Sequence, residues 1–383
     1  MNFERIREEI DRMIADGLPE AQVIIRKDGK EVFRYIAGYS DEAKTKPARY
    51  DDIFWLYSMS KVYTMTAALR LVERGVLDID EPIGTYLPAF KKLTVVDGDG
   101  VTELKSPLTL RRLMSMTGGF NYDTARYTEV QKLRENKKAS TMELVNAFSR
   151  TPLLFQPGER FMYGYGHDIV AGVIEAASGM SFGEFIKKEL LDPIGITDMG
   201  FHMSDEQLSR LAEKWKAEYD ENGKINYTLG IKSTNWLKLS ETYESGGAGL
   251  FGNAEQYIKL ADALANGGVA ENGYRVLKKE SIDLMRTNQL GDAALAEFHE
   301  EHPRRRAGYG YGLGVRTVMD TASAGICPSV KEFGWDGAAG SYVLIDPENH
   351  ISVVYAEHIM NHTSIYEKWH PMLRDLTYEC LKL

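Results

Sequence analysis

Cysteine is nearly absent from this chain of 383 residues, which contains only Cys327 and Cys380. Two thiols cannot form a disulfide framework, although a single bridge stays open. Long apolar runs are also absent, since no segment approaches the ~20 residues that a membrane-spanning helix needs. The first residues lack the basic and then apolar order of a signal peptide, so we expect a cytoplasmic protein that does not enter a membrane.

Positive charge is in deficit as well. The 46 Lys and Arg residues are outnumbered by 56 Asp and Glu residues, which gives a net charge of −10. Phosphate backbones and anionic lipids would repel such a chain, so neither nucleic acid nor a membrane is expected as its partner. With 43% hydrophobic and 27% charged residues, the composition is that of an ordinary globular protein.

Expected strands lie near both ends of the chain, and most expected helices lie between them. Hydrophobic spacing and turn residues predict strands at 21–26, 31–36, 312–318, 341–345 and 351–358. Helical patterns lie at 3–14, 60–74, 109–116, 141–150, 167–178, 181–190, 254–265 and 365–381. This order predicts an α/β (α+β) fold in which residues 1–80 and 281–383 form a discontinuous α/β lobe and residues 81–280 a mainly helical lobe.

A basic run, Arg304 to Arg306, stands beside Glu297, Glu300 and Glu301. Charges of both signs in one short segment are typical of a solvated loop. The run could instead steer an acidic substrate, but nothing else in the sequence supports this, and its role stays open.

The first indication of chemistry is the pair Ser58 and Lys61, three residues apart at the start of an expected helix. Side chains at this spacing share one face of a helix, so Nζ of Lys61 can approach Oγ of Ser58. A serine hydroxyl becomes a nucleophile when a base takes its proton, and lysine is such a base when burial lowers its pKa. The apolar run at 54–57, with Val62 and Met65, would provide that burial.

The same Ser-x-x-Lys spacing is expected about once by chance in a chain of this length. The alternative to catalysis is a serine that caps the helix and a lysine on its surface. In the catalytic interpretation, the backbone N–H of Ser58 would also stabilise a developing oxyanion.

Six sequence blocks carry a wider resemblance to a known family. They are Ile-Phe-Trp-Leu-Tyr-Ser-Met-Ser-Lys at 53–61, Leu-Val-Glu-Arg-Gly-Val-Leu-Asp-Ile-Asp-Glu-Pro-Ile at 71–83, Leu-Thr-Leu-Arg-Arg-Leu-Met-Ser-Met-Thr-Gly-Gly at 108–119, Phe-Gln-Pro-Gly-Glu-Arg-Phe-Met-Tyr-Gly-Tyr at 155–165, Glu-Ser-Gly-Gly-Ala-Gly-Leu at 244–250 and Phe-Gly-Trp-Asp-Gly-Ala-Ala-Gly-Ser at 333–341. Over most of residues 20–360 the chain resembles the serine β-lactamase and penicillin-binding-protein superfamily, and within it the esterase-type members of the class C-like branch. The resemblance implies a β-lactamase-like fold, an antiparallel sheet flanked by helices, with the active site between the two lobes.

The resemblance also implies a third catalytic residue, Tyr163, which matches the tyrosine of the family's Tyr-x-Asn motif. A phenol beside an ammonium group loses its proton more easily and could exchange it with the serine or the leaving group. The asparagine of that motif is replaced by Tyr165, which has no amide N–H to offer, and we expect it to line the pocket. Ser-Thr-Asn at 233–235 imitates a related motif but lies later in the chain, so we prefer Tyr163.

At the position where β-lactamases carry Lys-Thr-Gly, this chain has Trp335, Asp336 and Gly337, as in the esterase and acyltransferase members. An indole cannot form the ion pair with which the family's cation helps to hold a substrate carboxylate, so Trp335 favours neutral esters. Gly337 would let a substrate approach the backbone closely, and the N–H of Ala338 is expected to be the second oxyanion donor. Trp335 could instead be a core residue on a strand flanked by glycines.

Two further patterns are weak. Gly-x-Gly-x-x-Gly at 247–252 matches a dinucleotide-binding motif in form only, because no buried parallel strand precedes it, and we interpret it as a structural turn. His358 and His362 follow Glu357 without a zinc-binding signature, so we expect ordinary surface or loop histidines.

These residues predict a serine hydrolase that forms an acyl-enzyme with small carboxylic esters. The alternatives are a β-lactamase or D-alanyl-D-alanine carboxypeptidase, an acyltransferase to a small-molecule acceptor, and a non-catalytic binding module on the same fold. Position alone makes Phe120, Tyr122 and Trp236 candidate substrate-binding residues, besides Tyr165 and Trp335. The expected partner is a small-molecule ester or amide; no metal or organic cofactor is implied, and the oligomeric state is open.

Overall fold

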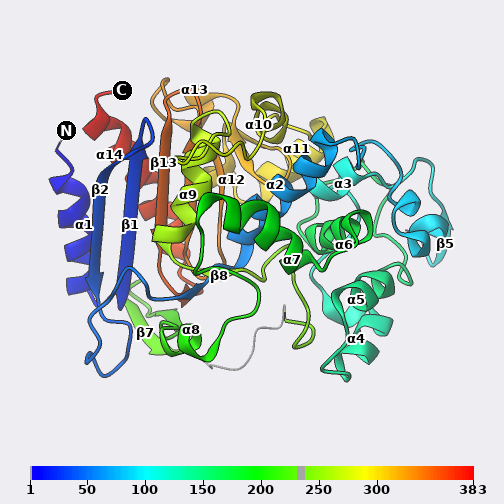
Figure 1. The fold of residues 1–383 in the computed structure, drawn as a ribbon, viewed down its shortest axis with the longest axis horizontal. Helices are drawn as coiled ribbons and strands as arrows, with labels where there is room; N and C mark the ends of the chain where they lie inside the picture. The colour runs from blue at the N-terminus through cyan, green and yellow to red at the C-terminus, as the bar shows by residue number, and fades with distance from the viewer. Residues whose placement is uncertain (1, 231–237) are drawn as a thin grey trace.

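A seven-stranded antiparallel sheet forms the centre of the protein, whose computed structural model describes residues 2–230 and 238–383 (Figure 1). In spatial order its strands are β2 (Lys30–Gly38), β1 (Glu20–Lys27), β13 (Ile351–Ala356), β12 (Tyr342–Asp346), β11 (Phe333–Asp336), β10 (Arg316–Val318) and β9 (Tyr309–Tyr311). The two N-terminal strands thus pair directly with the C-terminal ones, with Gln22 opposite Ala356. This confirms the predicted discontinuous sheet.

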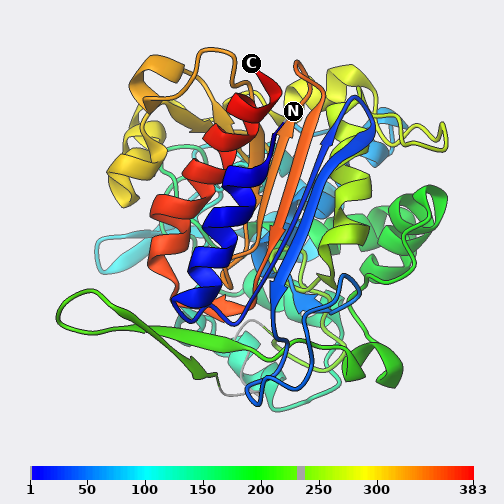
Figure 2. The ribbon, with the colours of Figure 1, turned by 90° about the vertical axis from the view of Figure 1, so that its left-hand side faces the viewer.

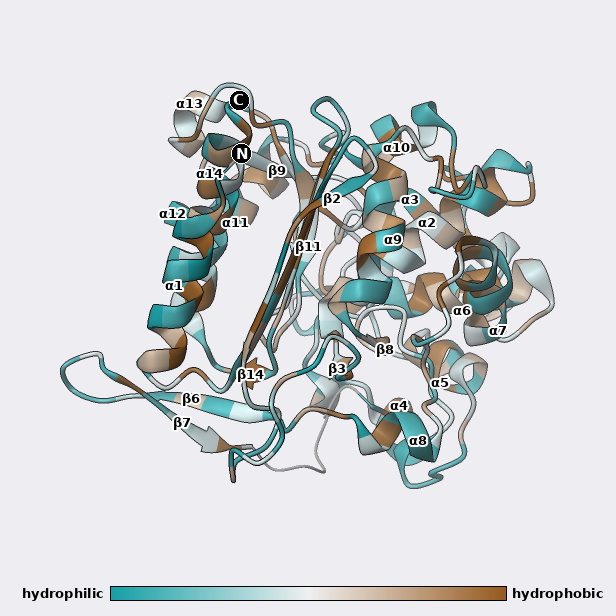
Figure 3. Cartoon of the chain, turned by 60° about the vertical axis from the view of Figure 1, so that its left-hand side comes forward, coloured by the Kyte–Doolittle hydropathy of each residue, from teal (hydrophilic) through white to brown (hydrophobic). Residues whose placement is uncertain are grey.

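Both faces of the sheet are covered by helices, as the edge-on view in Figure 3 shows. The helices α1 (Glu4–Ala15) and α14 (His370–Leu381) lie on one face, and α9 (Ala254–Ala265) lies on the other (Figure 2). Alternate side chains along a strand point to opposite faces, so Val23 and Ile25 pack toward α1 while Ile24 packs toward α9. All three are fully buried, which explains why this strand is apolar without alternation.

Most of the remaining helices lie beyond α2 (Ser60–Glu73), on its side away from the sheet (Figure 1). They include α3 (Leu110–Met114), α4 (Thr128–Arg134), α5 (Thr141–Phe148), α6 (Gly166–Ser178) and α7 (Phe182–Ile186), whereas α8 (Asp205–Ser209) lies apart from them, near β7 (Ile225–Leu229) (Figure 1). Shorter helices accompany the C-terminal strands: α10 (Lys279–Met285), α11 (Asp292–Glu301), α12 (Pro303–Arg306) and α13 (Thr321–Ala324). One helix that we placed in the helical lobe, α9, instead packs on strands β1, β12 and β13.

The structure contains strands that the sequence analysis did not predict, in the middle of the chain and near its C-terminus. They are β4 (Thr94–Asp97) with β5 (Gly100–Glu103), and β6 (Trp215–Tyr219) with β7 (Ile225–Leu229) and β14 (Ile359–Met360). The β6–β7 hairpin had a recognisable signal, since Asn222 and Gly223 form the residue pair that is typical of hairpin turns.

The strand expected at 312–318 is a hairpin instead. Strand β9 ends at Tyr311, β10 begins at Arg316, and Gly314 between them has φ 76°. At Gly312 an added Cβ would lie 2.1 Å from the carbonyl oxygen of Met285. The two glycines therefore allow a tight turn where β-branched neighbours suggested one continuous strand.

No single helix among residues 2–230 and 238–383 is long and apolar enough to cross a membrane. The pair Gly166–Ser178 and Phe182–Ile194 reaches the required length and composition only jointly, across a bend of 76°.

Candidate active site

Ser58 is held in a strained turn between a strand and a helix. The strand β3 (Phe54–Trp55) pairs with β8 (Phe251–Gly252), and α2 begins two residues after Ser58. Between strand and helix, Tyr57 has φ 47°, a left-handed conformation that costs a non-glycine residue on the order of 1–3 kcal/mol. The Ser60 hydroxyl supports the turn by donating to the carbonyl of Tyr57 at 2.6 Å. The turn leaves Ser58 at the start of the helix and only 8% exposed.

Lys61 points from the first turn of α2 back to Ser58. Its Nζ lies 3.0 Å from Ser58 Oγ, 2.7 Å from the carbonyl oxygen of Gly247 and 3.4 Å from the hydroxyl of Tyr122. Burial of the whole side chain lowers the pKa of Lys61 to about 7, although the charge of Asp168 acts in the opposite direction. An amine with this pKa is largely unprotonated just above neutral pH, so it can accept the serine proton.

Tyr163 approaches the same point from the loop before α6. The hydroxyl of Tyr163 accepts a hydrogen bond of 2.8 Å from Nε1 of Trp335, and Lys61 Nζ lies 4.6 Å from the centre of its ring. Burial raises the pKa of Tyr163, while hydrogen bonds with Ser58 and Trp335 lower it. The neighbouring Gly164 is required because an added Cβ would lie 2.3 Å from a backbone oxygen. Three candidate residues from two distant segments are thereby brought together.

A buried carboxylate, Asp168, lies near enough to Lys61 for the two charges to interact. Its Oδ1 accepts hydrogen bonds from the hydroxyls of Tyr243, at 2.7 Å, and Ser245, at 2.5 Å. Burial raises the pKa of Asp168, and the hydrogen bond from Ser245 is the largest influence in the opposite direction. Ser245 belongs to the glycine-rich turn that presents the Gly247 carbonyl to Lys61, which agrees with the interpretation of this segment as a structural turn.

Sequence reasoning missed Asp168. The residue lies five positions after Tyr163, directly before the apolar run at 169–174, and this acid beside an apolar run was the available signal. An acid in such a position is rarely buried without hydrogen-bonding partners.

The turn after β11 brings Ala338 close to Ser58. An added Cβ on Gly337 would lie 2.4 Å from the carbonyl oxygen of Leu56, so glycine permits contact with the segment that leads to Ser58. We expected Gly337 to let a substrate approach the backbone closely. The group that lies close to Gly337 in the structure is instead the carbonyl of Leu56. The N–H groups of Ser58 and Ala338 have no hydrogen-bond acceptor within residues 2–230 and 238–383, and Ala338 is exposed. Both can donate to an oxygen of a ligand.

The basic run at 304–306 is not the solvated loop that we expected. Arg305 pairs with the buried carboxylate of Asp336, and Arg316 contacts the same carboxylate at 3.2 Å. Burial opposes ionisation of Asp336, but the two guanidinium groups hold its pKa below the ordinary value. Arg306 is itself buried and pairs with Glu301 at 2.6 Å. The run forms α12, and it anchors the strand end that carries Trp335.

Three of the expected pocket residues, Phe120, Tyr165 and Trp335, are buried in the core. Phe120 is 3% and Tyr165 1% exposed. The ring of Tyr165 lies between Tyr127 and Tyr122, at centroid distances of 5.7 and 4.8 Å, so it supports Tyr122 from behind. Tyr122 itself is half-buried and reaches Lys61. Trp236 and the Ser-Thr-Asn segment at 233–235 lie outside the described residues.

The two histidines that we expected near the surface are buried. Nδ1 of His362 lies 2.7 Å from the carboxylate of Glu357, and Nδ1 of His358 lies 3.0 Å from the carbonyl oxygen of Ala212. The carboxylate and the carbonyl each pair with one ring nitrogen, whereas Nε2 of His358 is buried without a hydrogen-bond partner among the described residues. Within the described ranges 2–230 and 238–383, no group of three or more His, Cys, Asp or Glu side chains could hold a metal ion.

Comparison with known proteins agrees with this architecture. A lovastatin esterase from Penicillium rubens is 28% identical over 338 residues, which cover 81% of this chain and 80% of that protein. A putative D-alanyl-D-alanine carboxypeptidase from Escherichia coli K12 is 25% identical, covering 92% of this chain and 82% of that protein. The structure of EstCE1, described as a hydrolase with promiscuous acyltransferase activity, superposes with a TM-score of 0.80 at 24% identity and covers 98% of both chains. The family model described as Beta-lactamase matches residues 6–369, and the chain therefore belongs to the beta-lactamase family.

Proposed function

We propose that the protein is a serine esterase that works through an acyl-enzyme on Ser58. The observation that carries this proposal is the 3.0 Å separation between Ser58 Oγ and the buried amine of Lys61, whose pKa is lowered to about 7. A neutral amine has one lone pair and two N–H groups. The N–H groups can donate to the Gly247 carbonyl and the Tyr122 hydroxyl, which leaves the lone pair for the proton of Ser58.

In the first step, Ser58 Oγ attacks the ester carbonyl and Lys61 takes the serine proton. The N–H groups of Ser58 and Ala338 donate to the resulting oxyanion, and one such donor is worth about 3 kcal/mol. Collapse of the tetrahedral intermediate breaks the bond to the alkoxide, which leaves as the alcohol with a proton delivered through Tyr163. Water then attacks the acyl-enzyme and releases the carboxylic acid and free Ser58.

Ester substrates are favoured over β-lactams and peptides by Trp335. Its indole is buried and donates to Tyr163, so this position supplies no cation for a carboxylate beside the reacting carbonyl. The nearby guanidinium groups of Arg305 and Arg316 are paired with Asp336. The similarity to a lovastatin esterase supports the same choice.

The proposal is tested by intact-mass spectrometry of acid-quenched protein after incubation with a panel of small esters and one penicillin. We expect a mass increase equal to the acyl group of the ester, and peptide mapping should locate it on Ser58. Hydrolysis of esters with the adduct on another residue would contradict the proposal. A penicillin adduct without any ester adduct would instead favour a penicillin-binding activity.

Trp335→Phe should slow acylation while preserving the fold, because phenylalanine retains an aromatic ring but has no N–H for Tyr163. Loss of a hydrogen bond to a group that becomes charged costs about 1.5–3 kcal/mol, so we expect kcat/KM to fall roughly 10- to 100-fold. Steady-state kinetics with a p-nitrophenyl ester measure the effect, and the melting temperature shows whether the fold is intact. An unchanged kcat/KM would mean that the Trp335 hydrogen bond does not act on Tyr163 in the reaction.

A further inference from the structure

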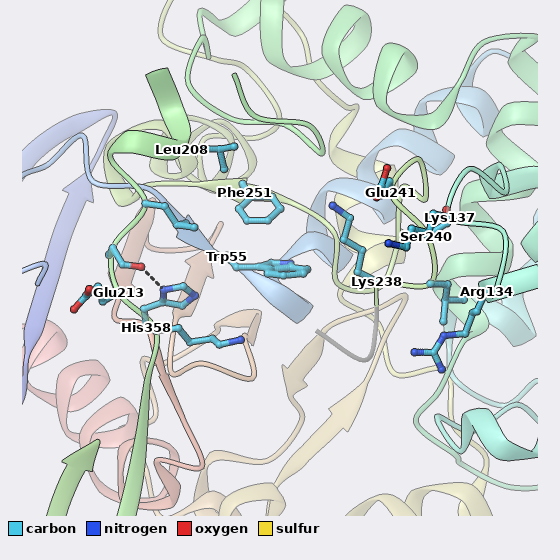
Figure 4. A pocket seen from close by; sticks show the side chains of 14 residues that line it. Trp55, Arg134, Lys137, Leu208, Glu213, Lys238, Ser240, Glu241, Phe251 and His358 are labelled. Carbon is cyan, nitrogen blue, oxygen red and sulfur yellow. Dashed lines mark hydrogen bonds between the residues drawn. The ribbon is translucent and has the colours of Figure 1, made fainter. Parts of the chain in front are cut away.

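A pocket of about 670 Å³ includes Trp55, three residues before Ser58, in its lining (Figure 4). The rings of Trp55 and Phe251 occupy its middle, with His358 on one side and Lys238 on the other (Figure 4). The two middle rings are stacked, with 4.7 Å between their centres. The pocket therefore has an apolar aromatic floor large enough for the body of a small organic molecule.

Trp55, which lines the pocket, also contacts the segments that position the catalytic groups. Nε1 of Trp55 donates to the carbonyl of Ala248 at 2.7 Å, and the preceding carbonyl, of Gly247, is the one that accepts from Lys61. On its other side, Trp55 stacks on Tyr57 at 5.1 Å, directly before Ser58. A molecule on the aromatic floor thus lies against the segments that hold both Ser58 and Lys61.

The rim of this pocket is rich in cations, in contrast to the net charge of −10 for the whole chain. Among the residues that the structure describes, four basic side chains line it and two acidic ones, Glu213 and Glu241. The four are Arg134, Lys137, Lys214 and Lys238. None of these four forms an ion pair with a described residue, and Arg134 differs in this from most other arginines of the described chain.

Lys214 is the most informative of the four. Its side chain is half-buried, and burial lowers the pKa of its amine, with no carboxylate partner in the described parts of the chain. By contrast Lys216, two residues later, is exposed and pairs with Glu218 at 2.9 Å. A cation that is partly desolvated without a counter-ion gains from an anion supplied by a ligand.

His358, on one side of the pocket, is polar but uncharged. Its Nδ1 lies 3.0 Å from the Ala212 carbonyl, and burial lowers its pKa to about 4, so the ring is neutral near pH 7. The positive charge of the pocket therefore comes from the lysines and Arg134.

We propose that this pocket binds a carboxylate carried by the ester substrate at a distance from the reacting carbonyl, with the intervening part of the substrate on Trp55 and Phe251. The proposal rests on the proposed esterase function and specifies its substrate class. It also explains why Trp335 stands where β-lactamases carry a cation. The charge of the substrate is recognised at the neighbouring pocket and not beside the reacting carbonyl.

The test compares charged and neutral esters of the same shape. Half-esters of p-nitrophenol with dicarboxylic acids of increasing length place the carboxylate on the acyl side, and p-nitrophenyl esters of the matching monocarboxylic acids are their neutral partners. The butyrate ester of 4-hydroxybenzoate places the carboxylate on the alcohol side, and the butyrate ester of p-cresol is its neutral partner. In at least one series, we expect kcat/KM for the charged ester to exceed that for the neutral one, and the excess to shrink at high salt.

Lys214→Gln should lower the ratio of charged to neutral kcat/KM about tenfold, mainly through KM. Lys238→Gln, a change at an exposed position, should lower it in the same direction and provides a second variant if the first does not fold. Lys216→Gln is the matched control, and its ratio should equal that of the wild type. A ratio near one in the wild type, or one unaffected by both pocket variants, would overturn the proposed pocket.

The same measurements separate the two proposals. If neutral esters are hydrolysed through Ser58 while the pocket variants leave the ratio unchanged, the esterase stands and the carboxylate pocket fails. If no ester is hydrolysed, titration calorimetry with 4-phenylbutyrate examines the pocket directly. Binding that Lys214→Gln weakens and Lys216→Gln does not would support the pocket, and no binding to the wild type would overturn it.

Discussion

Ser58→Ala is expected to lower kcat/KM for every ester by at least about 10⁴-fold and to abolish covalent labelling by a serine-directed phosphonate. The reason is that the variant has no oxygen to form the acyl-enzyme, while Lys61, Tyr163 and both N–H donors remain in place. Ester kinetics and intact mass after labelling measure the two effects. This loss corresponds to about 5 kcal/mol or more of transition-state stabilisation.

The control for this variant is Ser60→Ala, in the same motif. The Ser60 hydroxyl is tied to the backbone, donating to Tyr57 and accepting from the N–H of Leu250 at 2.9 Å. Its loss should therefore lower the melting temperature without removing the labelled residue. Labelling that persists in Ser58→Ala and disappears in Ser60→Ala would show that the nucleophile is the other serine.

Removal of the titratable amine in Lys61→Arg should have the second largest effect. A guanidinium group stays protonated at any accessible pH and cannot take the serine proton, so we expect kcat/KM to fall roughly 10³-fold. Mass spectrometry should show acylation slowed by the same factor, because the base acts in that step. Unchanged acylation by an activated ester would place the base elsewhere.

The wild-type pH profile follows from the same group. The pKa of Lys61 is lowered to about 7, and the active form is the unprotonated amine. The rate should therefore be nearly constant above this pH and fall tenfold per unit of pH below it. Asp168→Asn removes a charge that raises the pKa of Lys61 but keeps an oxygen for Tyr243 and Ser245, so the falling limb should move to lower pH. A limb that moves upward or stays in place would contradict this assignment.

Local patterns predicted much of the sheet and of the site. The hairpin of β1 and β2 has Asp28 and Gly29 in the left-handed conformation that its Asp-Gly turn signal indicates. The spacing of Ser58 and Lys61 predicted their contact because three residues along a helix return a side chain to nearly the same face. Both features depend on neighbours in the chain.

Long-range contacts could not be predicted in this way. Asp168 and Gly247 are 79 residues apart, yet their segments meet at Lys61 and set its environment. Aromatic type alone did not distinguish the buried Tyr165 from the half-buried Tyr122, and the charges of Arg305 and Arg306 did not reveal their buried partners.

By itself, the sequence determined strand segments near both ends of the chain and the pairing of a serine with a lysine on one helical turn, because periodicity and turn chemistry act over a few residues. Only the tertiary structure decided which groups surround this lysine, that Trp335 donates to Tyr163, and that cations with no ion pair among the described residues surround an aromatic floor near the serine. Those properties arise from burial and from electrostatic contact between segments distant in sequence, and they exist only once the chain has folded.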